Sequence, residues 1–318
     1  MKKLFKTLMI VAICGATIGM VSCKKDANGD DDNELVGGFD QNGASNAVFS
    51  ITKGDYGYDP VKVRFSRGNL QYQASTNTWR FAEHQWDYVG EANSNISSSY
   101  TGWIDLFGWA TSGLNTGART YQPWSTSTDW SSYVIDGSAG YQWRNNQNAD
   151  WGNNRISNGG NQAGVWHTLS RDDWNCLLSE RSASTINGVA NARYIKAIVN
   201  GVNGLVLFPD TFTMPSGINN PSEINSDSAP YNSNTYTESQ WSQMEDAGCI
   251  FLPAAGERHG TDVYDAGEYG IYWTCSPSSQ SSMAHRISFG DDSMVYGYND
   301  RYFYIGYSVR LVKYKTEY

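Results

Sequence analysis

The chain contains 318 residues, of which 40% are hydrophobic and 17% charged, so it can bury a core and is not globally disordered. The formal net charge is −9 and no basic cluster offsets it, which disfavours a protein that binds nucleic acid through the phosphate backbone. The counts of 32 Gly, 12 Trp and 21 Tyr against only 8 Pro favour many short strands joined by Gly, Asn and Ser turns.

Residues 1–22 have the pattern of a secretion signal. Basic residues precede an apolar stretch at 8–21, which is too short and too rich in Gly for a good membrane span. The small residue before Cys23 resembles the lipobox of bacterial lipoproteins, although Leu is usual where Met20 or Val21 stands. This resemblance implies a lipid on Cys23 and cleavage before it, and ordinary secretion is the alternative.

A disordered acidic tether is expected over residues 23–45. Residues 24–34 (KKDANGDDDNE) lack an apolar side chain that could pack, which is typical of a spacer. The three Asp residues at 30–32 resemble the surface-export signal of Bacteroidetes lipoproteins, and a solvated linker is the alternative. The folded domain is therefore expected to begin at residue 46.

The first part of the domain has the pattern of β-structure. Residues 47–72 alternate between apolar and polar side chains, and this period of two predicts strands. A turn at 75–77 leads into a further strand at 79–81, which makes a meander.

Residues 85–164 consist of short runs of Trp, Tyr, Gly and Asn with no sustained helical period. So long a loop region argues for a fold that tolerates it. We expect the Trp side chains to pin these loops to the body, and a sugar-stacking cleft is the alternative. The residues concerned are Trp86, Trp103, Trp109, Trp124, Trp130, Trp143 and Trp151.

Two helices are predicted in the second half of the chain. The first lies within 165–181 with Ser170 as its N-cap. The second begins at Thr237, whose spacing from Gln240 fits a capping box, and ends at the Ala-Gly pair 247–248. Further strands are predicted at 193–199, 204–208, 249–253, 269–273, 282–288, 293–296 and 307–313. An Asn-Gly pair between the first two of these strands predicts a hairpin.

The cysteines Cys176, Cys249 and Cys275 each stand in an apolar context. An odd number cannot pair entirely within the chain, and buried thiols are the favoured interpretation. A disulfide between Cys249 and Cys275 is left open.

Four motifs follow one another in the C-terminal half: GLVLFP at 204–209, IFLPAAG at 250–256, GIYWT at 270–274 and GYSVRLV at 306–312. As a set they resemble the C-type-lectin-like domains of Bacteroidetes surface proteins, which are related to the Fibrobacter succinogenes major paralogous domain and similar in fold to formylglycine-generating enzymes. The match is best over 160–313. It implies an α+β protein with one C-type-lectin-like domain, residues 46–318, built from short antiparallel strands, two main helices and long Trp/Gly/Asn-rich loops.

The segment 272–312 resembles the variable segment of diversity-generating retroelement proteins. Residues 280–305 consist largely of Asn, Asp, Ser, Tyr, His, Arg and Gly, which adenine mutation of Asn codons produces, although polar surface loops have a similar composition. Actual diversification is therefore left open. Two departures loosen the residue assignment: Ser is usual where Cys275 stands, and Arg301 is followed by four residues before Gly306 where two are expected.

The same resemblance implies a ligand-binding face within residues 283–304, with Trp273, Val309 and Leu311 holding its strands. Tyr rings would supply contact area and small polar groups adaptable hydrogen bonds. The expected ligand-binding residues are His285, Arg286, Ser288, Asp291, Ser293, Tyr296, Tyr298, Asn299, Asp300, Tyr302 and Tyr304.

No catalytic residue, metal or cofactor is expected, and we do not expect an enzyme. The histidines are His84, His167, His259 and His285. None of them shows metal-ligand spacing, and no phosphate-binding loop or nucleophile elbow occurs. His259 and His285 could meet Asp262 in space, but surface histidines are favoured. No Cys follows Cys275, so the closely spaced C-terminal Cys pair of formylglycine-generating enzymes is missing, which counts against an oxidase or hydrolase.

The sequence leaves calcium binding open, and no calcium-binding motif supports it. Asp262, Asp265 and Glu268, or the acidic pair 291–292, could supply oxygen ligands, yet neither group forms an EF-hand pattern. The Glu-Pro-Asn and Gln-Pro-Asp triplets of sugar-binding C-type lectins are absent. Solvated acidic turns are therefore expected.

These observations together predict a lipid-anchored, surface-exposed protein of the outer membrane. Its C-terminal face would bind a protein or glycan ligand, as a receptor or adhesin does, and no nucleic acid. The alternative is a structural envelope or adhesion subunit, in which the same face packs on neighbouring subunits.

Overall fold

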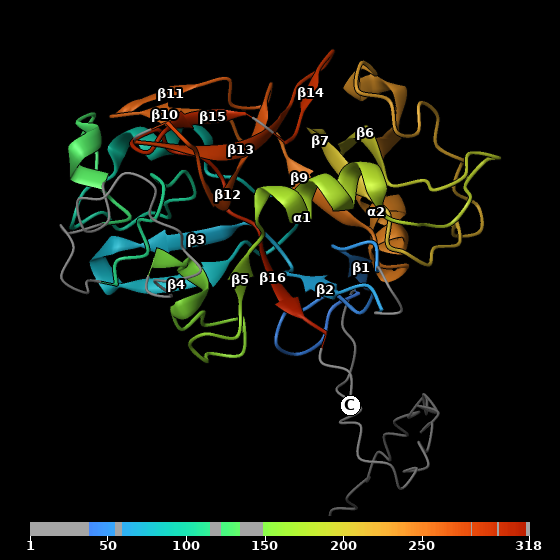
Figure 1. Ribbon diagram of the computed structural model, residues 1–318, viewed down its shortest axis with the longest axis horizontal. Helices are drawn as coiled ribbons and strands as arrows, with labels where there is room; N and C mark the ends of the chain where they lie inside the picture. The colour runs from blue at the N-terminus through green and yellow to red at the C-terminus, as the bar shows by residue number, and fades with distance from the viewer. Residues whose placement is uncertain are drawn as a thin grey trace, which may run out of the picture. The chain divides into compact units, whose positions relative to one another are not determined.

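The computed structural model describes residues 38–54, 59–114, 122–133, 149–280, 282–297 and 299–315 (Figure 1). All of them belong to one unit, Glu34–Tyr318. The predicted signal peptide, Cys23, Trp143 and Tyr298 lie outside the described residues. The protein is of the α+β class, as predicted, with small sheets, mostly antiparallel pairings and few short helices.

In the described part of the chain, three sheets have four strands each, and two further sheets are two-stranded hairpins. The first sheet has the order β1 (Phe49–Ser50), β2 (Lys62–Phe65), β16 (Leu311–Tyr314) and β5 (His167–Thr168). The second has the order β8 (Thr235–Tyr236), β6 (Tyr194–Val199), β7 (Val202–Leu207) and β9 (Ile250–Pro253). The third contains β12 (Gly270–Pro277), β13 (Met283–Phe289), β14 (Met294–Val295) and β15 (Asp300–Tyr302). The hairpins are β3 (Leu70–Gln73) with β4 (Thr78–Phe81), and β10 (Glu257–His259) with β11 (Asp262–Tyr264).

The first sheet, which we call the terminal sheet, joins both ends of the described chain. β16 lies between β2 and β5, with Val312 opposite Phe65. Residues 38–45, expected in the tether, are packed onto this end instead, because the Phe39 ring is buried in a core cluster. Gly38 has φ of +72°, and a Cβ there would lie 2.2 Å from the carbonyl oxygen of Glu245, so only glycine fits this contact.

Both predicted helix starts are confirmed. Ser170 caps α1 (Arg171–Asn175) and Thr237 caps α2 (Glu238–Asp246), each in a reciprocal capping box. The first helix lies within the predicted stretch 165–181, because a π-helical turn, Cys176–Glu180, continues α1. Before the Ser170 cap, His167 and Thr168 form β5, which pairs with β16.

Short 3₁₀ turns complete the helical structure of the described residues. They are Ala74–Thr76, Gly90–Asn95, Trp130–Tyr133, Trp151–Asn153 and Tyr231–Ser233.

The predicted β6–β7 hairpin turns at Asn200 and Gly201, which both have positive φ, as a type I′ turn requires. The terminal strands differ from the prediction at two places. Gly306, Tyr307 and Ser308 form isolated bridges rather than a continuous strand, and β16 begins only at Leu311. The stretch after Pro253, predicted as loop, contains the β10–β11 hairpin.

Tryptophans of the long loop region pack into two of the core clusters of the described residues. Within the loop region, Trp109 and Trp151 are fully buried, as the pinning interpretation predicts. The Trp109 indole donates to the Thr274 carbonyl at 2.9 Å, and the Trp273 indole donates to the Phe107 carbonyl at 2.8 Å, so loop and sheet hold each other. Trp86, Trp103 and Trp124 are partly buried and Trp130 is exposed.

A buried arginine, Arg258, donates hydrogen bonds to backbone carbonyl groups outside the strands. Arg258 donates to the carbonyl oxygens of Leu106, Ser125 and Gly260, which belong to three separate segments of the chain. Its burial lowers the pKa to about 10, so the guanidinium stays charged at neutral pH. This side chain therefore fastens the hairpin β10–β11 to the loops.

Cys176 and Cys249 are buried thiols, and Cys275 is a half-buried thiol. The Cys249–Cys275 disulfide that was left open does not form. Among the described residues, no helix is long and apolar enough to cross a membrane.

Candidate functional site

The expected ligand-binding residues that the structure describes lie on β13, β14 and β15 and in the turns between and after these strands, at one end of the described unit (Figure 1). β13 is paired with β12 along one edge and with β14 and β15 along the other. In the register, Met283 faces Tyr302 and His285 faces Asp300. The structure thus brings the two ends of the predicted segment together.

Two of the expected contact residues are buried instead. His285 is 6% exposed and Arg286 8% exposed, because β13 is the central strand of its sheet. Burial lowers the pKa of both side chains, and the Arg286 guanidinium lies 5.2 Å from the centre of the Tyr307 ring. These two side chains therefore lie beneath the predicted binding face and do not form its exposed surface.

Polar residues of the expected ligand-binding set form hydrogen bonds that stabilise the turns. Asp291 accepts a hydrogen bond from the backbone N–H of Tyr231 at 2.9 Å, and the carbonyl of Ser293 accepts one from Gly290. The Asn299 amide donates to the Ser288 hydroxyl at 3.2 Å. These turns are therefore shaped by the residues' own hydrogen bonds.

Asp300 and Tyr296 are also engaged inside the protein. The Ser278 hydroxyl donates to the Asp300 carboxylate, which ties β15 to the end of β12. The Tyr296 ring packs against a core cluster, and burial raises its pKa. Both side chains remain partly exposed.

Of the expected contact residues, Tyr302 and Tyr304 have aromatic rings at the surface. Their rings are stacked, with centres 5.6 Å apart and an angle of 14° between the planes. Tyr302 is 41% exposed and Tyr304 half-buried.

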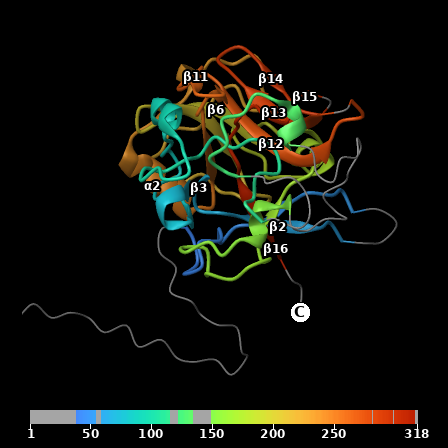
Figure 2. The ribbon, with the colours of Figure 1, turned by 90° about the vertical axis from the view of Figure 1, so that its left-hand side faces the viewer.

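The β10–β11 hairpin adds two rings that the sequence did not indicate. The His259 ring meets Tyr264 edge-on at 5.4 Å and Tyr304 edge-on at 6.4 Å, so a continuous line of rings runs from one hairpin to the next. Tyr264 is 48% exposed. We call this line, Tyr264, His259, Tyr304 and Tyr302, the aromatic strip. Figure 2 shows β11 and β15 at the same end of the unit.

A signal for the hairpin was present in the sequence. Gly260 has φ of +64° and makes the turn between His259 and Asp262, which face each other in the register. The His259 ring, however, bonds Glu257 at 3.1 Å and does not form a triad with His285 and Asp262. Its bond to a partly exposed carboxylate fixes how the ring lies between the two tyrosines.

A layer of buried rings carries the strip. Phe303 lies between Tyr302 and Tyr304 in sequence and stacks on Trp109, with centres 4.6 Å apart and planes 12° apart. The backbone of Trp109 donates to the Phe303 carbonyl at 2.7 Å, and Phe303 donates to the Ser282 carbonyl at 2.9 Å. The exposed rings therefore stand on a segment bonded from both sides, which lowers the entropy lost on binding.

Acidic side chains surround the β10–β11 turn without forming a cage. In the described part of the chain, no group of three or more His, Cys, Asp or Glu side chains is placed to hold a metal ion. The pKa of Asp265 is raised by burial, with smaller contributions from Glu257 and Glu268. Asp262, the other acid weighed for calcium, is exposed on β11.

The chain matches no family model, no curated protein and no solved structure.

Proposed function

We propose that this protein is a lipid-anchored surface receptor or adhesin that binds a partner protein through the aromatic strip. The observation that carries the proposal is the strip itself: rings in mutual contact, partly exposed, on a segment held by buried aromatics. Tyrosine gives a large contact area at a low entropic cost, and it is enriched where proteins recognise proteins. The anchor would be the lipid on Cys23, at the outer face of the outer membrane.

A C-type-lectin-like fold is part of this proposal. It is supported by the pairing of both chain ends in the terminal sheet and by the way the motifs meet. The N–H of Trp273, in GIYWT, donates to the carbonyl of Ser308, in GYSVRLV, at 3.1 Å. Tyr272, Trp273 and Val309 are buried, whereas Tyr302 between them in sequence is exposed. This division is what a segment with a constant frame and exchangeable contacts would need.

The binding test compares a double variant with a matched control. Fluorescently labelled full-length protein is screened against displayed bacterial surface proteins and against a glycan array. Tyr302→Ala with Tyr304→Ala should weaken protein binding at least tenfold, because two ring contacts are typically worth more than 1.4 kcal/mol. Tyr314→Ala, which removes an exposed tyrosine from the terminal sheet, should leave binding unchanged.

The outcomes separate the alternatives. Equal protein binding by the double variant and the parent protein contradicts a role for the strip, and glycan binding that the double variant loses but Tyr314→Ala keeps replaces the partner protein with a carbohydrate at the strip. Self-association that disappears in the double variant, measured by sedimentation, favours the structural envelope or adhesion subunit. Diversification of residues 272–312 is tested separately, by looking for a reverse-transcriptase gene and a near-copy of this coding stretch in the adjacent DNA.

A further inference from the structure

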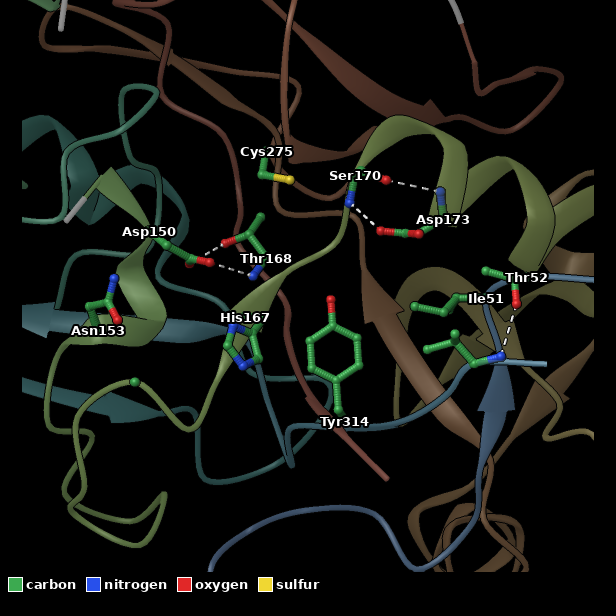
Figure 3. Close-up of a pocket in the computed structure, with 12 residues that line it drawn as sticks. Ile51, Thr52, Asp150, Asn153, His167, Thr168, Ser170, Asp173, Cys275 and Tyr314 are labelled. Atoms are coloured by element: carbon green, nitrogen blue, oxygen red, sulfur yellow. Dashed lines mark hydrogen bonds between the residues drawn. The ribbon is translucent and has the colours of Figure 1, made fainter. Parts of the chain in front are cut away.

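A cavity of about 560 Å³ opens beside the terminal sheet, away from the strip (Figure 3). Its walls come from the ends of β1, β2, β5, β12 and β16, together with the cap of α1. This volume lies within the range of pockets that hold small ligands. None of the expected ligand-binding residues lines it.

One wall of the cavity is apolar and aromatic. It contains Ile51, Val61 and the ring of Tyr314. Tyr314 is 44% exposed. The rings of Tyr314 and His167 lie 4.9 Å apart at an angle of 44°. In Figure 3, the Tyr314 hydroxyl points toward Cys275 and Ser170, so the ring stands between the two sides of the cavity.

The opposite wall carries hydrogen-bonding groups. Asn153 offers an amide, and Thr168 and Ser170 offer hydroxyls. The Thr168 hydroxyl donates to the Asp150 carboxylate at 2.8 Å. The Ser170 oxygen accepts from Asp173 N–H at 3.2 Å, which leaves its own O–H to be donated elsewhere.

The two carboxylates of the cavity are already engaged by protein donors. Asp150 accepts from Gly152 N–H at 3.0 Å and from Thr168 N–H at 3.1 Å, besides the hydroxyl. Burial raises the pKa of Asp150, so the carboxyl is a weaker counter-ion than an exposed one. Asp173 accepts from Ser170 N–H at 2.8 Å within the capping box. No Lys or Arg is among the described residues that line the cavity.

This combination selects for a neutral ligand with two chemically different sides. A strong anion would meet two carboxylates and, among the described lining residues, neither Lys nor Arg, and a cation would compete with backbone donors for the carboxylates. A pyranose ring fits both walls, because its axial C–H groups form an apolar face and its hydroxyls donate and accept around the edge. Aromatic rings take up such an apolar face, and amide and hydroxyl groups complete the hydroxyls' hydrogen bonds.

We propose that the cavity beside the terminal sheet is a binding site for a neutral monosaccharide unit, stacked on Tyr314 and hydrogen-bonded by Asn153 and Ser170. The site is separate from the aromatic strip and does not depend on the function proposed for it. The protein would thus carry two recognition sites, one for a partner protein and one for a sugar.

The test uses the full-length protein and five neutral sugars: glucose, galactose, mannose, xylose and N-acetylglucosamine. Saturation-transfer NMR at millimolar sugar should show transfer to the ring C–H protons of at least one of them. Tyr314→Ala should weaken the binding at least tenfold, and Asn153→Ala should weaken it several-fold. Tyr264→Ala, which removes an equally exposed tyrosine from the strip, is the matched control and should bind as the parent does.

Cys275 gives a second readout that needs no substitution. Its thiol lies at the cavity and is half-buried, whereas Cys176 and Cys249 are buried. A bound sugar should slow the reaction of Cys275 with iodoacetamide, followed by peptide mass spectrometry, and should leave the reaction in 6 M urea unchanged. Each variant is first checked for a parent-like circular dichroism spectrum.

Three results would overturn the proposal. The first is no saturation transfer to any of the five sugars. The second is transfer that persists equally in Tyr314→Ala and Asn153→Ala, or a rate at Cys275 that sugar does not change. The third is binding of ethanolammonium or glucuronate in place of the neutral sugars, which would assign a charged ligand to the cavity.

Discussion

The aromatic strip and the cavity beside the terminal sheet share no residue and are built in opposite ways. The strip comes from two neighbouring hairpins, 257–264 and 283–304, and turns its rings outward. The cavity comes from segments far apart in the chain and surrounds one tyrosine with polar groups. An exposed line of rings suits a large partner, and a concave site with one apolar and one polar wall suits a small ligand.

The two sites also differ in what supports them. Under the strip lie stacked aromatic rings, whose contribution is mainly apolar burial. Around the cavity lie a helix cap and a carboxylate that accepts several hydrogen bonds, whose contribution is mainly polar. Substitutions can therefore weaken one site at a time, and the size of the loss should follow the kind of support removed.

The largest effect is expected from Phe303→Ala. The change removes a buried ring that stacks on Trp109, and large-to-small changes of this kind cost about 3–5 kcal/mol. Urea unfolding should show this loss in the free energy of unfolding. In the fraction that remains folded, partner binding at the strip should fall while saturation transfer to sugar in the cavity persists.

Val295→Ala is the control for this experiment. Val295 lies on β14 of the same sheet and is exposed, so its truncation should change stability by less than about 0.5 kcal/mol. A loss below about 1 kcal/mol for Phe303→Ala would mean that the stacked layer does not hold the strip. Loss of sugar binding together with partner binding would mean that the two sites are not independent.

A pH effect of intermediate size is expected from Asp105, which lies in the loop that Arg258 fastens to the strip. The carboxyl is fully buried, and it accepts from the N–H of Val89 at 2.7 Å and the amide of Asn93 at 2.8 Å. Burial is the main cause that raises its pKa from 3.8 to about 6. Between these pH values the folded protein keeps a proton that the unfolded chain has released, so stability is lost as the pH rises.

At about 1.36 kcal/mol for each unit of pKa difference, this group alone should lower the free energy of unfolding by about 2 kcal/mol between pH 4 and pH 6, because the titration is only partly complete at either end of that range. Asp105→Asn does not titrate, so its curve should lack that part of the slope. Urea unfolding of both proteins at pH 4, 5, 6 and 7 measures the difference. Parallel curves would show that the buried carboxyl is not protonated more readily in the folded state.

Local sequence signals predicted much of the fold. The capping residues Ser170 and Thr237, the Asn200-Gly201 turn and the α+β class are all confirmed, because each depends on residues that are neighbours in sequence. The short strand before the Ser170 cap was not predicted, since it depends on the pairing of His167 with Val312, far away in sequence. The packed start at Gly38 likewise depends on a distant contact, with Glu245.

The residues of the candidate sites also divide into those that the sequence indicated and those that it did not. Tyr302 and Tyr304 could be named from composition, but the burial of His285 and Arg286 follows from the central place of β13, which composition does not reveal. His259 joined the strip only through an unpredicted hairpin. The cavity had no sequence signal at all, because Tyr314, Asn153 and Ile51 meet only when the terminal sheet has formed.

The smallest effect on stability, and the sharpest separation of the two sites, is expected from Ser170→Ala. Ser170 caps α1 and Thr237 caps α2 in the same way, so replacing either by Ala should cost about 1 kcal/mol. Only Ser170 lines the cavity, where its hydroxyl can donate to a sugar. Thermal unfolding should therefore show similar losses of stability for Ser170→Ala and Thr237→Ala. Sugar affinity should fall about fivefold in Ser170→Ala alone, because one lost hydrogen bond costs about 1 kcal/mol. Equal sugar binding by both variants would remove Ser170 from the site, and weaker binding by both would show that the cavity responds to overall stability and not to its own wall.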